Sequence, residues 1–426
     1  MNTMLYYGLM AILRNGNWVI ISPHFDEVIR IKADRINDQN IFEELKRRGF
    51  FGPASPKFSG PEVSLVTLIT TGACNLLCIY CFANSGASTI VMPEEVAFAA
   101  IRKGIKNASG KKLSIPFFGG EPTLTPDLIR KAVEYAKKAI IGTDVLGVEF
   151  SITTNGVMNR SFLEFLMEND FLITISMDGP PIVQDFQRPL KNGDKSSSYA
   201  EETVRILTRS GKDFKIRATV TKYSVPYMVD TIEWLHSLGG KKIHFEVISI
   251  AGRAAMQTKE ERPARPDVHV FTENLKRAIT RGGELGVRVI NSSFMNLMNP
   301  PKEFCDGNTN RRFAVSYTGE VTTCVEVQDK CHPVASQFIT GCYDKSTGEI
   351  EMNREQRGRA CGAKLQIGAI NNCSECFAKR ICGGGCPVRN FHTTRDSFTV
   401  DPYRCQLIKE IMPFIVGLFD KATYGD

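Results

Sequence analysis

The sequence predicts an α/β fold in which helices flank a parallel sheet, followed after residue 300 by a cysteine-rich region. Between residues 63 and 248, six strand-like runs alternate with amphipathic stretches of helical period. This alternation stops near Asn299, and ten of the 13 cysteines lie beyond residue 300. The alternation predicts parallel strands but leaves open whether the sheet closes into a barrel.

Apolar runs bounded by turn residues define the expected strands, and apolar residues at helical spacing define the expected helices. The strands are expected at Val63–Thr70, Leu113–Phe118, Val148–Thr153, Leu172–Met177, Phe214–Val220 and Ile243–Ile248. The helices are expected at Pro93–Lys106, Pro126–Ala139, Arg160–Asn169, Tyr199–Arg209 and Pro226–Leu238.

Three parts are expected along the chain. Residues 1–60 contain two apolar runs around an Asn15-Gly16 turn and a helical stretch near residues 40–48, which predicts a hairpin-plus-helix cap or a reduced peptide-recognition segment. Residues 61–299 carry the β/α alternation, and residues 300–426 carry the late cysteines and a final helix. The composition shift at Asn299-Pro300-Pro301 marks the expected boundary between the last two parts.

The charge and hydropathy patterns limit the class of partner. With 53 basic and 46 acidic residues the net charge is +7, which is compatible with an acidic peptide. Because like charges form no block, we expect no nucleic-acid partner. No apolar run reaches the roughly 20 residues of a membrane span and no signal peptide is evident, so we expect a cytoplasmic protein without a membrane partner. In a reducing compartment, 13 cysteines point to metal binding or catalysis rather than to disulfides.

The first three cysteines form a compact motif directly after the first predicted strand. Cys74, Cys78 and Cys81 follow a C-x3-C-x2-C spacing, which lets one loop present three thiolates to one metal centre. Three ligands on a four-iron cluster leave one iron open to a small chelating molecule. A zinc site is the alternative, but structural zinc usually has four protein ligands.

Three further motifs follow at the ends of successive predicted strands. Phe118-Gly-Gly-Glu-Pro122 ends the second strand, Thr153-Thr-Asn-Gly156 the third, and Ser176-Met-Asp-Gly-Pro180 the fourth. Each motif alone is compatible with a turn or a helix cap. Their shared position is more informative, because parallel α/β folds place their sites at the carboxyl ends of strands.

The cysteine triad, with Tyr80 before its last cysteine, and the ordered motifs after it resemble the radical SAM superfamily. The resemblance implies a partial (β/α)6 TIM-like barrel and a [4Fe-4S] cluster on Cys74, Cys78 and Cys81 that binds S-adenosylmethionine (SAM). It further implies cleavage of SAM to methionine and a 5′-deoxyadenosyl radical that abstracts a hydrogen atom. The glycine pair and Glu121 are expected to hold the SAM amino group, and Ser176 and Arg188 its ribose and carboxylate. Arg217 and Thr219 on the fifth strand and Phe245 to Val247 on the sixth are expected to flank the adenosyl group. The implied SAM-binding residues are Tyr80, Gly119, Gly120, Glu121, Asn155, Ser176, Asp178, Arg188, Arg217 and Phe245.

The late cysteines are similar in spacing to the SPASM extension of radical SAM enzymes, although a zinc tetrathiolate is the alternative. They read Cys305-x13-Gly319-x4-Cys324, then Cys373-x2-Cys376-x5-Cys382-x3-Cys386, then Cys405. The resemblance implies two auxiliary [4Fe-4S] clusters, and therefore three clusters in all. The first auxiliary cluster would use Cys305, Cys324 and Cys386, and the second Cys373, Cys376, Cys382 and Cys405. Cys331, Cys342 and Cys361 are unassigned: one of them completes the first auxiliary cluster, or an iron of that cluster is open to substrate. The alternative for each of the three is a small buried apolar side chain.

SPASM enzymes mostly act on peptides and proteins. We therefore expect a maturase that installs a thioether or carbon–carbon crosslink in a ribosomally synthesised precursor peptide, with a flavodoxin or ferredoxin as reductant. Anaerobic sulfatase maturases, which make formylglycine, are the alternative, but they place an aspartate directly after the cysteine of G-x4-C. Here that position is Val325, followed by Glu326. Glu326 or Asp329 is the candidate base, although loop carboxylates are usually only solvated.

A non-catalytic iron–sulfur electron carrier or a zinc scaffold would account for the cysteines alone. Neither role needs a SAM site, so the Gly-Gly-Glu-Pro and Ser-x-Asp-Gly motifs argue against both.

Overall fold

The computed structural model describes residues 3–6, 9–21, 28–48, 50, 63–258, 263–295, 312–353, 355, 373 and 376–424. Cys305 and Cys361 lie outside the described residues, and so does the expected boundary between residues 299 and 300.

One large sheet organises the molecule, and the expected α/β class is confirmed. The six predicted strands are present, adjacent, parallel and in sequence order. They are β5 (Val63–Ile69), β6 (Lys112–Phe118), β7 (Gly147–Thr154), β8 (Leu172–Ser176), β9 (Phe214–Val220) and β10 (Lys242–Val247).

The sheet extends beyond these six strands at both edges. β11 (Arg288–Ile290) pairs in parallel with β10, and β12 (Arg312–Val315) pairs in parallel with β5. Antiparallel strands β13 (Glu320–Thr322), β14 (Ile339–Asp344) and β15 (Glu349–Met352) then continue from β12. The segment that contains Cys324 therefore begins as part of the same sheet as the β/α units.

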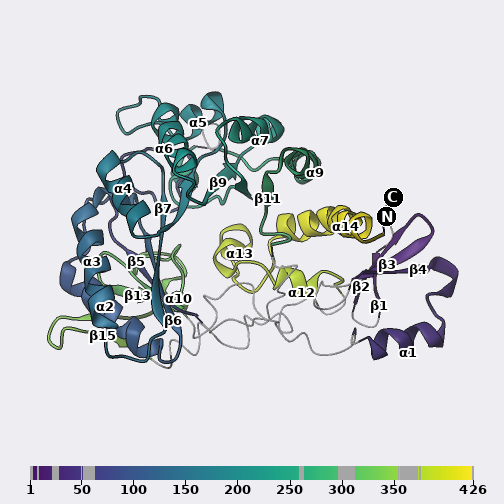
Figure 1. The fold of residues 1–426 in the computed structure, drawn as a ribbon, viewed down its shortest axis with the longest axis horizontal. Helices are drawn as coiled ribbons and strands as arrows, with labels where there is room; N and C mark the ends of the chain where they lie inside the picture. Colours follow the sequence, from purple (N-terminus) through teal and green to yellow (C-terminus); the bar gives the residue numbers. More distant parts are fainter. Residues whose placement is uncertain are drawn as a thin grey trace.

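Helices follow the parallel strands and lie along the outer side of the sheet (Figure 1). They are α2 (Glu94–Asn107), α3 (Pro126–Ala139), α4 (Arg160–Glu168), α5 (Pro181–Gln187), α6 (Ser197–Arg209), α7 (Met228–Ser237) and α9 (Val268–Leu285). The five predicted helices are confirmed to within two residues at each end, and α5 and α9 were not predicted.

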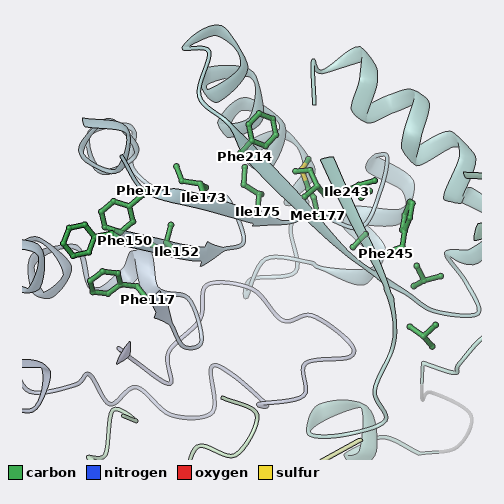
Figure 2. Packing of buried hydrophobic residues seen from close by; sticks show 14 of the residues in the cluster. Phe117, Phe150, Ile152, Phe171, Ile173, Ile175, Met177, Phe214, Ile243 and Phe245 are labelled. Carbon is green, nitrogen blue, oxygen red and sulfur yellow. The ribbon is translucent and has the colours of Figure 1, made fainter. Parts of the chain in front are cut away.

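Alternation along the strands separates an apolar core from a polar interior. On β9, Phe214, Ile216 and Ala218 are buried, whereas Lys215 and Arg217 between them are only half-buried. Figure 2 shows the core side, where buried residues of neighbouring strands pack together. The Phe171 ring lies 5.7 Å from the Phe117 ring and 5.5 Å from that of Phe150. Because period-2 alternation points these side chains one way, the intervening side chains line the opposite face.

The first 50 residues form a separate small sheet. β1 (Thr3–Tyr6), β2 (Leu9–Arg14), β3 (Asn17–Ile21) and β4 (Val28–Lys32) pair antiparallel in that order, and α1 (Gln39–Arg47) follows. The predicted hairpin is confirmed: Asn15 and Gly16, with φ of 48° and 72°, form a two-residue turn between β2 and β3.

The last helix, α14 (Pro402–Tyr424), lies beside this small sheet, so the two chain ends are neighbours (Figure 1). Asp420 of α14 is 3% exposed. Arg30 Nε donates to Asp420 Oδ1 at 2.6 Å, and Arg14 Nη1 donates to Oδ2 at 3.3 Å. One buried carboxylate therefore joins β2 and β4 to the C-terminal helix.

Four short α-helices and three 3-10 helices complete the described elements. The α-helices are α8 (Arg253–Met256), α10 (Ala335–Phe338), α12 (Lys379–Cys382) and α13 (Pro387–Thr394). Within the described part of the chain, every helix is too short or too polar to cross a membrane.

We predict that Asp420→Asn loosens the N-terminal sheet. The substitution leaves two arginines without their shared carboxylate, so the free energy of opening β3 and β4 should fall by about 1–3 kcal/mol. Native-state hydrogen exchange of the amides in these strands measures it. The control is Asp170→Asn, because the Asp170 side chain is 88% exposed where it meets Lys212, and solvent-exposed ion pairs contribute little to stability. Equal protection of β3 and β4 in the two variants would contradict the role of Asp420.

Candidate active site

A cavity of about 400 Å³ opens among the cysteine triad and the inner faces of β6 to β10. It contains all three triad cysteines and most of the residues predicted to bind SAM. Those lining it are Tyr80, Gly119, Gly120, Glu121, Asn155, Ser176, Arg188 and Arg217. Motifs that are scattered over 144 positions of the sequence, from Cys74 to Arg217, thus share one wall.

Each triad sulfur accepts at least one hydrogen bond. The Leu76 backbone N–H donates to Cys74 Sγ at 3.4 Å, and the Ser85 backbone N–H donates to Cys81 Sγ at 3.2 Å. Arg188 Nη1 donates to Cys78 Sγ at 3.6 Å. Donors aimed at sulfur stabilise thiolates and tune the potential of an iron–sulfur cluster. The three sulfurs and their donors therefore fit a cluster held by this loop.

Burial makes the free thiols weak acids. It raises the pKa of Cys74 to about 12 and that of Cys78 to about 11. Both thiols are therefore protonated at neutral pH without metal, and iron binding must displace their protons.

The glycine pair of the Gly-Gly-Glu-Pro motif packs directly against the triad loop. Gly120 N donates to Thr71 O, and Glu121 N donates to Ala73 O, each at 2.8 Å. A Cβ on Gly120 would lie 2.1 Å from the Ala73 carbonyl oxygen. Only glycine permits this approach, because the obstructing atom belongs to the backbone.

Glu121 carries a buried carboxylate at the cavity wall, where 1% of the residue is exposed. Its Oε1 accepts from Thr123 N and Oγ1 at 3.1 and 2.8 Å and from Thr154 Oγ1 at 2.7 Å, while Oε2 accepts from Asn155 N at 2.7 Å. Burial raises the pKa of Glu121, although these donors oppose the rise. A fixed carboxylate in this setting fits an ammonium group such as that of SAM.

Asp178, predicted among the SAM contacts, lies behind the cavity wall instead of lining it. Its Oδ2 accepts a short hydrogen bond from the Tyr80 hydroxyl and one from Gln187 Nε2 at 2.7 Å. Arg188 Nε lies 3.1 Å from the same oxygen, and Thr219 N donates to Oδ1 at 2.8 Å. Arg188 therefore faces the cavity, and Asp178 orients Arg188 from behind the cavity wall.

Phe245, also predicted near the adenosyl group, belongs to the apolar core and is 1% exposed (Figure 2). The cavity is lined at this strand by its neighbours Glu246 and Val247.

The sequence did not identify an ion network on the far side of the cavity. Glu246 Oε1 accepts from Arg389 Nη1 and from Ser292 Oγ, each at 3.0 Å, and Oε2 lies 3.2 Å from His244 Nε2. Burial alone would raise the pKa of Glu246, but Arg389 and His244 outweigh burial and hold it well below its usual range. Alternation on β10 makes a cavity-facing carboxylate predictable, whereas its pairing with Arg389 of α13 depends on tertiary structure.

The structure places Glu326 in the cavity, next to Val325. Its side chain is 18% exposed, and its Oε1 lies 3.7 Å from Arg389 Nε. This candidate base is therefore not simply a solvated loop carboxylate, whereas Asp329 does not line the cavity.

The late cysteines that the structure describes fall into two neighbourhoods. Cys324 and Cys386 pack against one small apolar cluster that includes Val327 and Val388. Cys376, Cys382 and Cys405 are close enough that their charges act on Cys373, whose pKa burial raises to about 11. Cys331 and Cys342 are exposed. Within the described residues, no three His, Cys, Asp or Glu side chains are arranged to hold a single metal ion, and the ligand sets stay predictions.

We predict that Gly120→Ala disrupts the triad loop. Its Cβ collides with the Ala73 carbonyl, so the reconstituted protein should lose the iron of one cluster and its SAM binding. Iron analysis and equilibrium dialysis with SAM measure both. Gly283→Ala is the control, because a Cβ there meets nothing within 4 Å. If Gly120→Ala keeps its iron content and its affinity for SAM, the close contact of Gly120 with the Ala73 carbonyl is not required for either.

Comparisons with known proteins agree with this geometry. The family model described as the radical SAM superfamily matches residues 68–235. The Cysteine-type anaerobic sulfatase-maturating enzyme of Clostridium perfringens is 26% identical over 370 residues, covering 83% of this chain and 96% of the relative.

Solved structures show the same fold. That of native anSMEcpe with bound AdoMet and the Cp18Cys peptide matches with a TM-score of 0.68 at 23% identity, covering 85% of this chain and 99% of that one. Streptococcus suis SuiB bound to its precursor peptide SuiA matches with a TM-score of 0.53 at 13% identity, covering 94% of this chain and 99% of that one. Residues 68–235, which supply the triad and strands β6 to β9 of the cavity wall, form a radical SAM domain, and this domain is that of an enzyme that uses SAM with a [4Fe-4S] cluster.

Proposed function

We propose that this enzyme is a peptide maturase that installs a thioether or carbon–carbon crosslink in a ribosomally synthesised precursor peptide. One observation carries the proposal: the cavity is shared between the SAM motifs and Val325, Glu326 and Arg389 of the cysteine-rich region. A substrate in this cavity would lie between the radical source and the late cysteines.

Cys74, Cys78 and Cys81 would hold the SAM-binding cluster, and Glu121, Ser176 and Arg188 would hold SAM. When bound, the cluster and SAM supply a 5′-deoxyadenosyl radical that abstracts a hydrogen atom from the substrate. The chain contributes orientation, because Asp178 fixes Arg188 and the Gly120 approach fixes the triad loop. Glu326 would accept the proton that the substrate releases.

The cysteine-rich region would act as a SPASM domain with two auxiliary clusters. These clusters would accept the electron released when the product forms, or bind a substrate thiolate. The structural likeness to SuiB, which was solved with a precursor peptide, supports a peptide as partner. A flavodoxin or ferredoxin would supply the first electron.

Formylglycine formation in a sulfatase is the second candidate function. The sequence likeness to the sulfatase-maturating enzyme over 83% of the chain favours it. Val325 in place of the expected aspartate argues against it, and Glu326 would have to act as the base from the next position.

We predict that Cys78→Ala reduces 5′-deoxyadenosine formation to background, because the triad would lose the ligand that Arg188 contacts. The measurement is chromatography of anaerobic reactions with SAM and dithionite. Cys342→Ala is the matched control, because Cys342 is an exposed thiol on β14. Deoxyadenosine formation by Cys78→Ala at the wild-type rate would refute the assignment.

We predict that the enzyme removes two hydrogen atoms from a short peptide encoded beside its gene and leaves no aldehyde. Tandem mass spectrometry locates the crosslink, because fragments inside the ring are missing. A sulfatase peptide with its target cysteine or serine is the competing substrate. If the sulfatase peptide gives an aldehyde that reacts with a hydrazide probe, and the peptide encoded beside the gene is unchanged, the enzyme forms formylglycine and not a crosslink.

A further inference from the structure

The cavity carries polar side chains that the SAM motifs do not use. β9 points Lys215, Arg217 and Thr219 into it, and β8 points Thr174 and Ser176 into it. Interiors of (β/α) barrels are usually packed with branched apolar side chains. A half-buried lysine at this depth therefore needs a chemical reason.

Thr174 and Lys215 form a row across neighbouring strands with Thr153, which also lines the cavity. Thr153 of β7 lies opposite Thr174 of β8, and Thr174 lies opposite Lys215 of β9 in the parallel register. Adjacent strands are about 4.8 Å apart, so two hydroxyls and an ammonium follow one another at that spacing. The row presents three hydrogen-bond donors to the cavity.

The row lies beyond the residues assigned to SAM. Ser176 and Arg217 are opposite one another, two positions further along the same parallel strands and nearer the carboxyl ends where the triad sits. Two residues of strand span about 7 Å. Thr174 and Lys215 are therefore one layer deeper, on the side away from the triad.

These donors are unpaired in the described part of the chain. The Thr153 and Thr174 hydroxyls and the Lys215 ammonium make no intramolecular hydrogen bond or ion pair there. Burial and two neighbouring cations, Arg217 and Lys242, lower the pKa of Lys215.

The other charged groups of the cavity already have partners. Arg188 pairs with Asp178, and Arg253 donates to the carbonyls of Cys78 and Ser85 at 2.7 and 2.5 Å. Glu246 and Glu326 share Arg389 on the other side. Arg217 Nη1 lies 3.5 Å from His244 Nδ1 and is assigned to SAM. Among the described residues, Lys215 is therefore the cavity cation that has neither a protein partner nor a SAM role.

We propose that Thr153, Thr174 and Lys215 form a binding site for an acidic side chain, Asp or Glu, of the substrate peptide. The carboxylate would accept a charge-assisted hydrogen bond from Lys215 and bonds from the two hydroxyls. The proposal rests on the proposed function only in taking a peptide as the occupant. It makes the sequence around the modified residue part of substrate selection, in line with the net charge of +7.

The test uses binding without turnover, so it is independent of which bond the enzyme makes. Acetyl-Gly-Glu-Gly-amide and acetyl-Gly-Gln-Gly-amide are titrated by calorimetry into the full-length, anaerobically reconstituted enzyme loaded with SAM. The wild type should bind the glutamyl probe about tenfold more tightly or better. Lys215→Met should abolish this preference, and the near-isosteric Thr174→Val should reduce it, with the affinity for SAM unchanged in both.

Lys212→Met is the matched control, because Lys212 precedes the same strand but pairs with Asp170 at 2.8 Å. It should keep the wild-type preference. Three results would overturn the proposal: equal binding of both probes by the wild type, a preference that survives in Lys215→Met, or a tenfold loss of SAM affinity in Lys215→Met. The last result would assign Lys215 to the carboxylate of SAM. Failure of the enzyme to modify any peptide would refute the proposed function and leave the binding comparison intact.

Discussion

The buried carboxylate of Asp178 is the interaction on which the site depends. It joins the Tyr80 hydroxyl of the triad loop, the end of α5 at Gln187 and Arg188, and the backbone of β9 at Thr219. A carboxylate that is 3% exposed is costly to bury unless it is paired and hydrogen-bonded, and Asp178 is both. Its cost is offset only when loop, helix and strand are all in place, so the Arg188 that contacts Cys78 is fixed by the fold itself.

The opposite side of the cavity repeats this principle between more distant parts of the chain. Glu246 of β10 pairs with Arg389, which lies three residues after Cys386, and Arg389 also approaches Glu326, two residues after Cys324. Ser292, which donates to Glu246, accepts from Arg404 next to Cys405 at 2.9 Å. The segments that carry Cys324, Cys386 and Cys405 are therefore positioned relative to the SAM motifs by one buried carboxylate and its donors.

Sequence periodicity predicted the β/α units well because each strand and helix carries its own local pattern. The strands from β5 to β10 and the helices between them follow from apolar alternation and turn residues. Contacts between distant segments have no such local pattern. Three features depend on how separate segments meet: the pairing of β12 with β5, the ion pair of Glu246 with Arg389, and the position of Asp178 behind the cavity wall. Within the expected range Phe245 to Val247, the order of the motifs predicts the strand but not that Glu246 and Val247 line the cavity while Phe245 packs in the core.

The polar inner face of the sheet has a structural consequence as well as a chemical one. Because the inner faces of β8 and β9 carry Thr174, Ser176, Lys215 and Arg217, these strands gain little apolar burial from the inside. Their stability must come from the other face, where Ile173, Ile175 and Phe214 lie in the apolar core (Figure 2). Ile216 is buried in the same core cluster. This division leaves the inner face free to carry charge. A substrate that brings a carboxylate to Lys215 would then add a favourable contact to the inner face, so binding would stabilise these strands.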